Sequence, residues 1–273
     1  MSFNFRKAMN TISDVVQNRP IPLREFDQIY MKVGDLIIQS DFIARRFNNL
    51  DVLFIGDGDA ISLTIMHLKN QGIFNYGPSK IHVLDFDERV VNSINKFASN
   101  NELSTCISSE LYNVADPLPT NLLVCKDAFY TNPPWGASND GESVIAFMER
   151  GMESLVKNGL AAIVIADDET LPWTQEILHK TQHVFINNGY MIIEMIPGLA
   201  NYHLDDAPEL KSCTLITKKI DEVNTIKISK PLDQKRLYNF YGRESPLRVR
   251  YIRDLSRLNR RRAQDGSYSL EPM

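Results

Sequence analysis

The chain has 273 residues, of which 43% are hydrophobic and 23% are charged, a composition that excludes a disordered or collagen-like chain. No run of 18 apolar residues occurs, so a membrane-spanning helix is excluded as well. Its cysteines, Cys106, Cys125 and Cys213, lie far apart and predict neither a metal site nor a disulfide framework. Because the N-terminus also lacks an apolar signal core, we expect a cytoplasmic protein.

The formal net charge of −4 is unevenly distributed along the chain. Residues 227–262 carry twelve Lys or Arg side chains against three acidic ones, so an acidic body precedes a basic C-terminal tail. An acidic body suits a cationic substrate, whereas a basic tail favours an anionic partner. Charge alone therefore does not choose the partner.

The first 50 residues predict a helical segment. Phe5, Met9 and Ile12 recur at helical spacing, and a second apolar set lies within residues 36–47. The prolines within residues 19–22 separate the two sets, because proline is excluded from the interior of a helix.

From residue 51 onward, short apolar runs alternate with amphipathic stretches. The expected strands are residues 51–55, 81–84, 122–130, 160–166, 190–196 and 212–217. The expected helices are residues 60–70, 88–100, 143–157 and 172–187. Strands that alternate with helices indicate a parallel, doubly wound α/β sheet, so we expect a Rossmann-like domain over residues 51–222.

Residues 223–273 form the predicted basic C-terminal extension. It contains charged and aromatic residues but little apolar periodicity, so we expect it to contribute little to the core. The last residues, 267–273, are expected to fray.

The loop Gly56-Asp57-Gly58-Asp59 follows the first predicted strand. Glycines between a strand and a helix let backbone amides approach a ligand, although an ordinary turn has the same pattern. Two aspartates would repel a pyrophosphate but suit a cationic nucleoside. S-adenosylmethionine and its decarboxylated form are sulfonium cations of this kind.

Asp85 ends the next predicted strand. An acidic residue there can bind both hydroxyls of a ribose. The alternative is that Asp85 or Asp87 caps the helix that begins near Glu88. With two acids at this corner, one can cap the helix while the other binds a ligand.

The tetrad Asn132-Pro133-Pro134-Trp135 follows the strand predicted at residues 122–130. The Asn132 side-chain oxygen and a proline-flanked backbone carbonyl can accept hydrogen bonds from an attacking amine. Trp135 offers a face for a base or a cation. The alternative is a plain turn with a packed tryptophan.

Taken together, these motifs resemble the branched-chain polyamine synthase family, the N4-bis(aminopropyl)spermidine synthases. The segments that carry the resemblance occur in the family's order over roughly residues 18–220. They are residues 19–22 with Phe26-Asp27-Gln28, residues 56–59, residues 84–89, residues 112–119 and residues 131–135.

The resemblance implies a mostly parallel seven-stranded sheet of the class I methyltransferase type. It also implies a catalytic domain over residues 51–222 that uses decarboxylated S-adenosylmethionine as donor and no metal. The acceptor it implies is a polyamine such as spermidine. The residues expected to bind the donor are Gly56, Gly58, Asp85, Phe86, Asn113 and Gln28.

The family's Gly-Asp-Asp-Asp motif falls on residues 56–59, where Gly58 replaces the middle aspartate. Asn113 likewise replaces the acid that would meet the adenine amine, and it can still accept through its carbonyl. Family members also tend to carry a winged-helix-like N-terminal region, for which this sequence is too short.

Five residues are expected to act in catalysis. Asp57 and Asp59 would take the proton of the attacking amine or position it, since polyamines are protonated near neutral pH. Asn132 and the Pro133 carbonyl would orient that amine. Trp135 would lie over the sulfonium or ammonium group.

Two alternatives remain open at the sequence level. An N-methyltransferase that acts on an exocyclic base amine of RNA or DNA would use the same tetrad, with S-adenosylmethionine as donor. The basic tail would then bind nucleic acid through its phosphates. A non-catalytic protein descended from such an enzyme is the second alternative. The oligomeric state is not fixed either, with a homodimer as one candidate.

Overall fold

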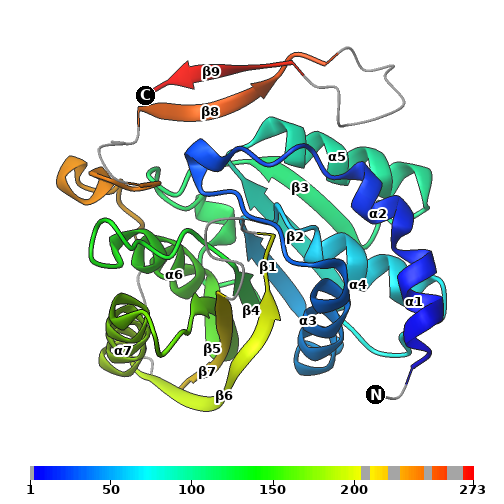
Figure 1. The fold of residues 1–273 in the computed structure, drawn as a ribbon, viewed down its shortest axis with the longest axis horizontal. Helices are drawn as coiled ribbons and strands as arrows, with labels where there is room; N and C mark the ends of the chain where they lie inside the picture. The colour runs from blue at the N-terminus through cyan, green and yellow to red at the C-terminus, as the bar shows by residue number, and fades with distance from the viewer. Residues whose placement is uncertain (1–2, 204–209, 221–227, 243–247, 257–266) are drawn as a thin grey trace.

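The computed structural model describes residues 3–203, 210–220, 228–242, 248–256 and 267–273, and a seven-stranded sheet lies at its centre (Figure 1). The strand order is β3-β2-β1-β4-β5-β7-β6. β7 runs antiparallel to both of its neighbours, β5 and β6, and the other neighbouring strands of this sheet run parallel. The strands are β1 (Asp51–Ile55), β2 (Lys80–Asp85), β3 (Ile107–Leu111), β4 (Lys126–Thr131), β5 (Leu155–Ala166), β6 (Tyr190–Asn201) and β7 (Lys211–Lys219). This topology confirms the expected mostly parallel, class I methyltransferase-like sheet.

Helices cover both faces of this sheet (Figure 1). They are α1 (Phe5–Thr11), α2 (Ser13–Asn18), α3 (Val33–Arg46), α4 (Ile61–Asn70), α5 (Glu88–Asn100), α6 (Glu142–Ser154) and α7 (Pro172–Asn187). Short 3-10 helices occupy Arg24–Phe26, Thr120–Leu122 and Gln234–Leu237. Three of these helices, α1, α2 and α3, lie within the first 50 residues, where the sequence predicts a helical segment.

The boundaries of several predicted elements differ from the structure. Leu122 was expected to begin a strand but lies in a 3-10 helix, and β4 begins only at Lys126. The helix expected to reach residue 157 ends at Ser154, because Leu155 already belongs to β5. The edge strand β3 coincides with no predicted element, since its sequence, Ile-Ser-Ser-Glu-Leu, contains only two apolar residues.

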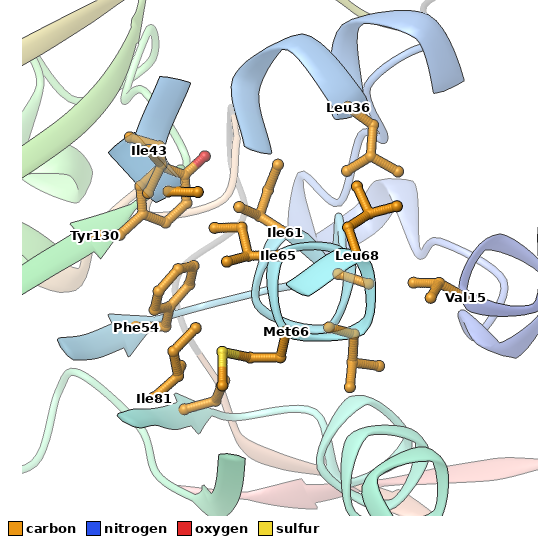
Figure 2. Packing of buried hydrophobic residues seen from close by; sticks show 14 of the residues in the cluster. Val15, Leu36, Ile43, Phe54, Ile61, Ile65, Met66, Leu68, Ile81 and Tyr130 are labelled. Atoms are coloured by element: carbon orange, nitrogen blue, oxygen red, sulfur yellow. The ribbon is translucent and has the colours of Figure 1, made fainter. Parts of the chain in front are cut away.

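The side chains of β1 point alternately to the two faces of the sheet, and each face has its own hydrophobic cluster. Val52 and Phe54 belong to the cluster beneath α3, α4 and α5, whereas Leu53 and Ile55 belong to the cluster beneath α6 and α7. Successive strand residues point to opposite faces, so a strand buried on both faces is apolar throughout. Figure 2 shows the first cluster, in which α4 contributes side chains between those of α3 and the sheet.

The C-terminal extension is part of the second core, so the expectation that it contributes little is wrong. Leu237, Phe240, Tyr241 and Ile252 are buried there. They come singly from irregular segments and one short strand, which is why no helical or strand periodicity revealed them.

The expected frayed terminus is wrong as well, because residues 268–272 form a strand. This strand, β9 (Tyr268–Pro272), pairs antiparallel with β8 (Val249–Asp254). The hairpin lies along α5 at the edge of the molecule (Figure 1). The Ile252 amide donates to the Phe86 carbonyl oxygen at 3.1 Å, which joins β8 to the end of β2.

Arginines of the extension pair with acidic residues of the body. Arg236 contacts Glu142 at 2.9 Å and Glu149 at 2.8 Å, and Arg250 contacts Asp116 at 2.9 Å. The two oppositely charged parts of the sequence therefore meet in the folded protein. The basic run at residues 260–262 lies outside the described residues.

None of the helices in the described ranges is both long enough and apolar enough to cross a membrane.

Candidate active site

Two adjoining cavities lie over the carboxyl ends of the central strands. The first cavity is bounded by the loops after β1 and β2, and the second by the loop after β4 together with Tyr202, which follows β6, and the start of α7. Asp27, Ile29 and Asn132 line both cavities. In open α/β sheets this edge is where ligands bind.

Glycine suits two positions of the loop after β1, for different reasons. Gly56 has φ of +74°, a left-handed conformation that side chains other than glycine rarely adopt. At Gly58, an added Cβ would lie 3.2 Å from a ring carbon of Tyr30. An aspartate at position 58 would therefore bring its Cβ into close contact with the Tyr30 ring. Both glycines, which were expected to bind the donor, line the first cavity.

Asp57 does not line the first cavity, contrary to the expectation that it meets the substrate. Its carboxylate accepts from the backbone amides of Ile61 at 2.9 Å and Ser62 at 3.2 Å, and also from the Ser62 hydroxyl. Burial raises the pKa of Asp57, and the hydrogen bonds from Ser62 oppose that rise. The side chain satisfies the first amides of α4, because helix N-termini leave such donors unpaired.

Asp59 does line the first cavity, and its carboxylate is held on two sides. It accepts from the Met31 amide and from the Asn132 side-chain nitrogen, each at 2.7 Å. Burial raises the pKa of Asp59, whereas both hydrogen bonds and the Arg19 charge lower it. Asp59 and Asn132, predicted from separate motifs, are therefore direct neighbours.

The sequence left open whether Asp85 or Asp87 caps the helix α5. Asp87 is the N-cap of α5 and accepts from the Arg89 amide at 3.0 Å. Asp85 lines the first cavity and accepts from the amides of Asp57 at 3.0 Å and Asp87 at 2.9 Å. Burial, together with the Asp87 charge, raises the pKa of Asp85 to about 7.

Gln28 and Phe86 also lie at the first cavity. The Gln28 side-chain nitrogen donates to Asp87 at 2.9 Å, and its oxygen accepts from the Leu23 amide at 2.8 Å. Phe86 stacks on Tyr241, with ring centroids 5.4 Å apart. The side chain of Gln28 thus fixes the N-terminal segment against the end of β2.

Asn113 was expected to contact the donor, but it does not line the first cavity. Its side-chain nitrogen donates to the Arg250 carbonyl at 2.7 Å, and its oxygen accepts from the Ala115 amide at 2.9 Å. Both halves of the amide are therefore used within the protein. Tyr112 and Val114, on either side of it, face the cavity instead.

Pro133 and Trp135 line the second cavity and not the first. The Trp135 indole nitrogen donates to the Val164 carbonyl at 3.1 Å, and its ring meets Tyr202 edge to face at 5.3 Å. Asn132 lies between the two cavities, where its oxygen accepts from the Tyr202 hydroxyl at 3.5 Å. The tetrad thus contributes to both cavities.

Several residues of the site were missed in the sequence. Asp27 lies in a segment that carries the family resemblance, yet only its neighbour Gln28 was selected. Tyr241 lies in the aromatic C-terminal extension, and neither Tyr30 nor Tyr202 belongs to a motif identified in the sequence. These residues are aromatic or acidic and lie outside the regular alternation of strands and helices. Apolar periodicity does not detect such residues.

The charged side chains that line the first cavity, among the described residues, are all acidic. Three carboxylates line it, those of Asp27, Asp59 and Asp85, whereas no Lys, Arg or His does so in the part of the chain that the structure describes. Within the same ranges, no group of three or more His, Cys, Asp or Glu side chains is placed to hold a metal ion. The cavity therefore suits a positively charged organic ligand.

Comparison with known proteins gives a consistent family likeness. A protein-family model described as the branched-chain polyamine synthase A C-terminal domain matches residues 7–268. Proteins named N(4)-bis(aminopropyl)spermidine synthase are 28% identical over 72% of this chain in Thermococcus kodakarensis and 31% identical over 74% in Methanocaldococcus jannaschii. The matches cover 53% and 54% of those proteins, so the chain spans about half the length of the curated relatives it matches.

Solved structures show the same fold. The branched-chain polyamine synthase from Thermus thermophilus, determined with N4-aminopropylspermidine and 5′-methylthioadenosine, superimposes with a TM-score of 0.65. It is 19% identical in sequence, and the match covers 86% of this chain and 70% of that one. At this identity the likeness concerns the fold.

Proposed function

The chain belongs to the family of the branched-chain polyamine synthase A C-terminal domain, and from this premise we propose that it is an aminopropyltransferase. The donor is decarboxylated S-adenosylmethionine, and the acceptor is an amine nitrogen of a polyamine such as spermidine. We also propose that it acts in the cytoplasm, because all three cysteines are unpaired and a reducing compartment keeps them so.

The observation that carries the choice of donor is the charge of the first cavity. Decarboxylated S-adenosylmethionine has a sulfonium and an ammonium group but no carboxylate. S-adenosylmethionine has the same two cations and a carboxylate, for which the described lining offers three repelling aspartates and no basic side chain. The decarboxylated form is therefore favoured.

The donor is oriented by groups that already have fixed positions. In this proposal Asp85 accepts from the ribose hydroxyls, which is supported by its position at the end of β2 and by the two amides that anchor its carboxylate. Gly56 and Gly58 let the loop backbone approach the ligand. The paired rings of Phe86 and Tyr241 supply an apolar wall for the adenine.

The acceptor amine enters from the second cavity and reacts beside Asn132, where the cavities meet. The Asn132 oxygen and the Pro133 carbonyl accept N–H bonds from the amine, and Trp135 lies against its cationic or methylene portion. The amine nitrogen then forms a bond to the aminopropyl carbon next to sulfur. The carbon–sulfur bond breaks, its electron pair stays on sulfur, and neutral 5′-methylthioadenosine leaves. Alignment of nitrogen, carbon and sulfur supplies most of the rate.

Calorimetric titration with the two donors, followed by mass spectrometry of reactions with spermidine, tests this function. We expect tighter binding of the decarboxylated donor and a product heavier by one aminopropyl group per transfer. Tighter binding of S-adenosylmethionine, with methyl incorporation into RNA or DNA, would instead establish the alternative N-methyltransferase.

A further inference from the structure

Asp27 occupies the junction between the two cavities. It follows the 3-10 helix Arg24–Phe26 and has φ of +57°, in the left-handed region. Like Asn132, it lines both the first and the second cavity. A group in this place can contact a donor on one side and an acceptor on the other.

The carboxylates of the site differ in how far their oxygens are already used. Asp59 accepts two hydrogen bonds, Asp85 accepts two, and Asp57 accepts three from the start of α4. Asp27 accepts none from the described residues, although its backbone amide donates to the Arg24 carbonyl at 3.1 Å. Its carboxylate therefore keeps its full capacity to accept a proton.

We propose that Asp27 is the general base of the reaction and removes a proton from the acceptor ammonium group before attack. This inference rests on the proposed aminopropyl transfer. One proton moves from the acceptor nitrogen to an Asp27 oxygen, which leaves a neutral amine and a carboxylic acid. The amine then displaces 5′-methylthioadenosine, the product nitrogen carries the positive charge of the donor, and Asp27 releases its proton to water.

The surroundings of Asp27 suit this task. Burial raises its pKa to about 7, and the Arg24 charge opposes that rise. A base with a pKa near the working pH is ionised in part and still accepts protons readily. The other titratable or charged groups that line the two cavities are Tyr30, Asp59, Asp85, Tyr112, Tyr202 and Tyr241. Of these, Asp59 and Asp85 are tied by hydrogen bonds, and the tyrosines keep raised pKa values through burial.

Asp27→Asn is a clean test because asparagine tolerates the left-handed conformation as well as aspartate does. We expect kcat at pH 7 to fall by roughly 10²- to 10⁴-fold. Donor affinity, measured by calorimetry, should stay within about tenfold, since the donor contacts of Asp85 and the loop glycines persist.

The pH profile separates a base from a merely structural residue. Wild-type kcat should rise with pH and level off above about 7. The Asp27→Asn rate should keep rising by about tenfold per pH unit from 7 to 9, because the free-amine fraction of an acceptor with a pKa near 10 grows at that rate. In Arg24→Gln, kcat should level off at a higher pH than in the wild type, because a positive charge that favours the ionised carboxylate of Asp27 is lost.

Glu25→Gln is the matched control, because Glu25 is exposed, lies on the same turn and lines neither cavity. It should leave kcat and the pH profile unchanged. If the wild type transfers aminopropyl groups and Asp27→Asn does so at the same rate, with the same levelling above pH 7, Asp27 is not the base. If the wild type transfers none, the proposed function itself fails, and this inference fails with it.

Discussion

At the scale of single residues, Asp85 connects the two loops that form the first cavity. Its two oxygens accept from the backbone amides of Asp57 and Asp87, one in each loop. The same carboxylate lines the cavity beside Phe86. One side chain therefore both holds the two loops and faces the cavity.

Asp85→Asn should weaken donor binding by about ten- to a hundredfold. The amide replaces one acceptor oxygen with a donor, and a hydrogen bond to a charged group contributes about 1.5–3 kcal/mol. Calorimetric titration with decarboxylated S-adenosylmethionine measures the effect. Asp140→Asn serves as the control, because that side chain is exposed on the surface. Unchanged donor affinity in Asp85→Asn would mean that Asp85 serves only the loops.

Asp85 also predicts a pH dependence of stability. Its pKa is about 7 in the folded protein and near 3.8 when unfolded, so the folded state binds more protons between these values. The free energy of unfolding of the wild type minus that of Asp85→Asn should fall as pH rises from 5 to 7, by on the order of 2 kcal/mol. Urea denaturation at pH 5, 6, 7 and 8 measures the difference, and a rise with pH would contradict the raised pKa.

The sequence predicted where most of the site lies but not the direction of each side chain. Gly56, Asp59 and Asp85 were found because they follow apolar strands, whose carboxyl ends meet at one edge of the sheet. Asp57 belongs to the same loop, yet it points to the amides of α4, because adjacent residues in a turn face different ways. Asp27 lies before the alternating elements begin, so strand-end reasoning did not reach it.

At the scale of elements, α4 depends on a carboxylate that precedes it. Asp57→Ala should lower the free energy of unfolding by about 1–2 kcal/mol, because the first amides of α4 lose their acceptor. Urea denaturation measures this loss. Asp14→Ala is the control, since Asp14 lies in the first turn of α2 and lines neither cavity. An Asp57→Ala protein of wild-type stability would refute the capping role.

The C-terminal extension should contribute both stability and donor affinity. Tyr241 is buried, packs against Phe26 and Phe86 and lines the first cavity. Tyr241→Ala should lower the free energy of unfolding by about 3–5 kcal/mol, as large-to-small substitutions of buried aromatic residues do, and should weaken donor binding. Tyr238→Ala is the control, because Tyr238 is 59% exposed.

Thermal unfolding followed by circular dichroism, together with calorimetry, measures both effects of Tyr241→Ala. Equal stability of the Tyr241 and Tyr238 variants would show that the extension is dispensable. A protein that ends at Lys219 loses Leu237, Phe240 and Ile252 as well, all of them buried. We expect it to lack a cooperative unfolding transition, since each such side chain contributes about 1.5–3 kcal/mol of a total near 5–15.

The elements that the sequence predicted are those with strong periodicity. Strands such as β1 are apolar throughout because both faces are buried, and α5 is amphipathic because only one face is buried. The sequence did not predict the edge strand β3 or the hairpin of β8 and β9, because edge strands mix polar and apolar residues. The sequence did not predict which residues of the extension are buried, because tertiary contacts and not a local pattern bury them.

At the scale of the whole molecule, the acidic body and the basic extension partly neutralise each other. Arg236, Arg250 and Arg253 each contact at least one carboxylate. Arginines engaged in this way are not free to bind phosphates without losing those contacts. The separation of charge along the sequence is therefore much smaller in space.

Single-stranded RNA and DNA oligonucleotides should accordingly bind weakly to the full protein. Fluorescence anisotropy at several salt concentrations measures the affinity and its salt dependence. Each phosphate contact adds about one unit to the slope of log K against log salt concentration, so we expect a shallow slope. Tight binding with a steep slope would contradict this expectation and would support the alternative N-methyltransferase that acts on RNA or DNA.

The walls of the first cavity come from distant parts of the chain. Phe26 and Tyr30 lie near its beginning, Gly58 and Asp85 in the sheet loops, and Tyr241 near its end. A ligand that binds only the folded state stabilises it in proportion to the logarithm of ligand concentration over Kd. A donor that fills this cavity as proposed would contact both the segment around Phe26 and Tyr30 and the segment around Tyr241, so neither segment could open locally while the donor is bound. Under the proposed function, donor binding would therefore couple the local opening of these two segments, so that they open together and not independently.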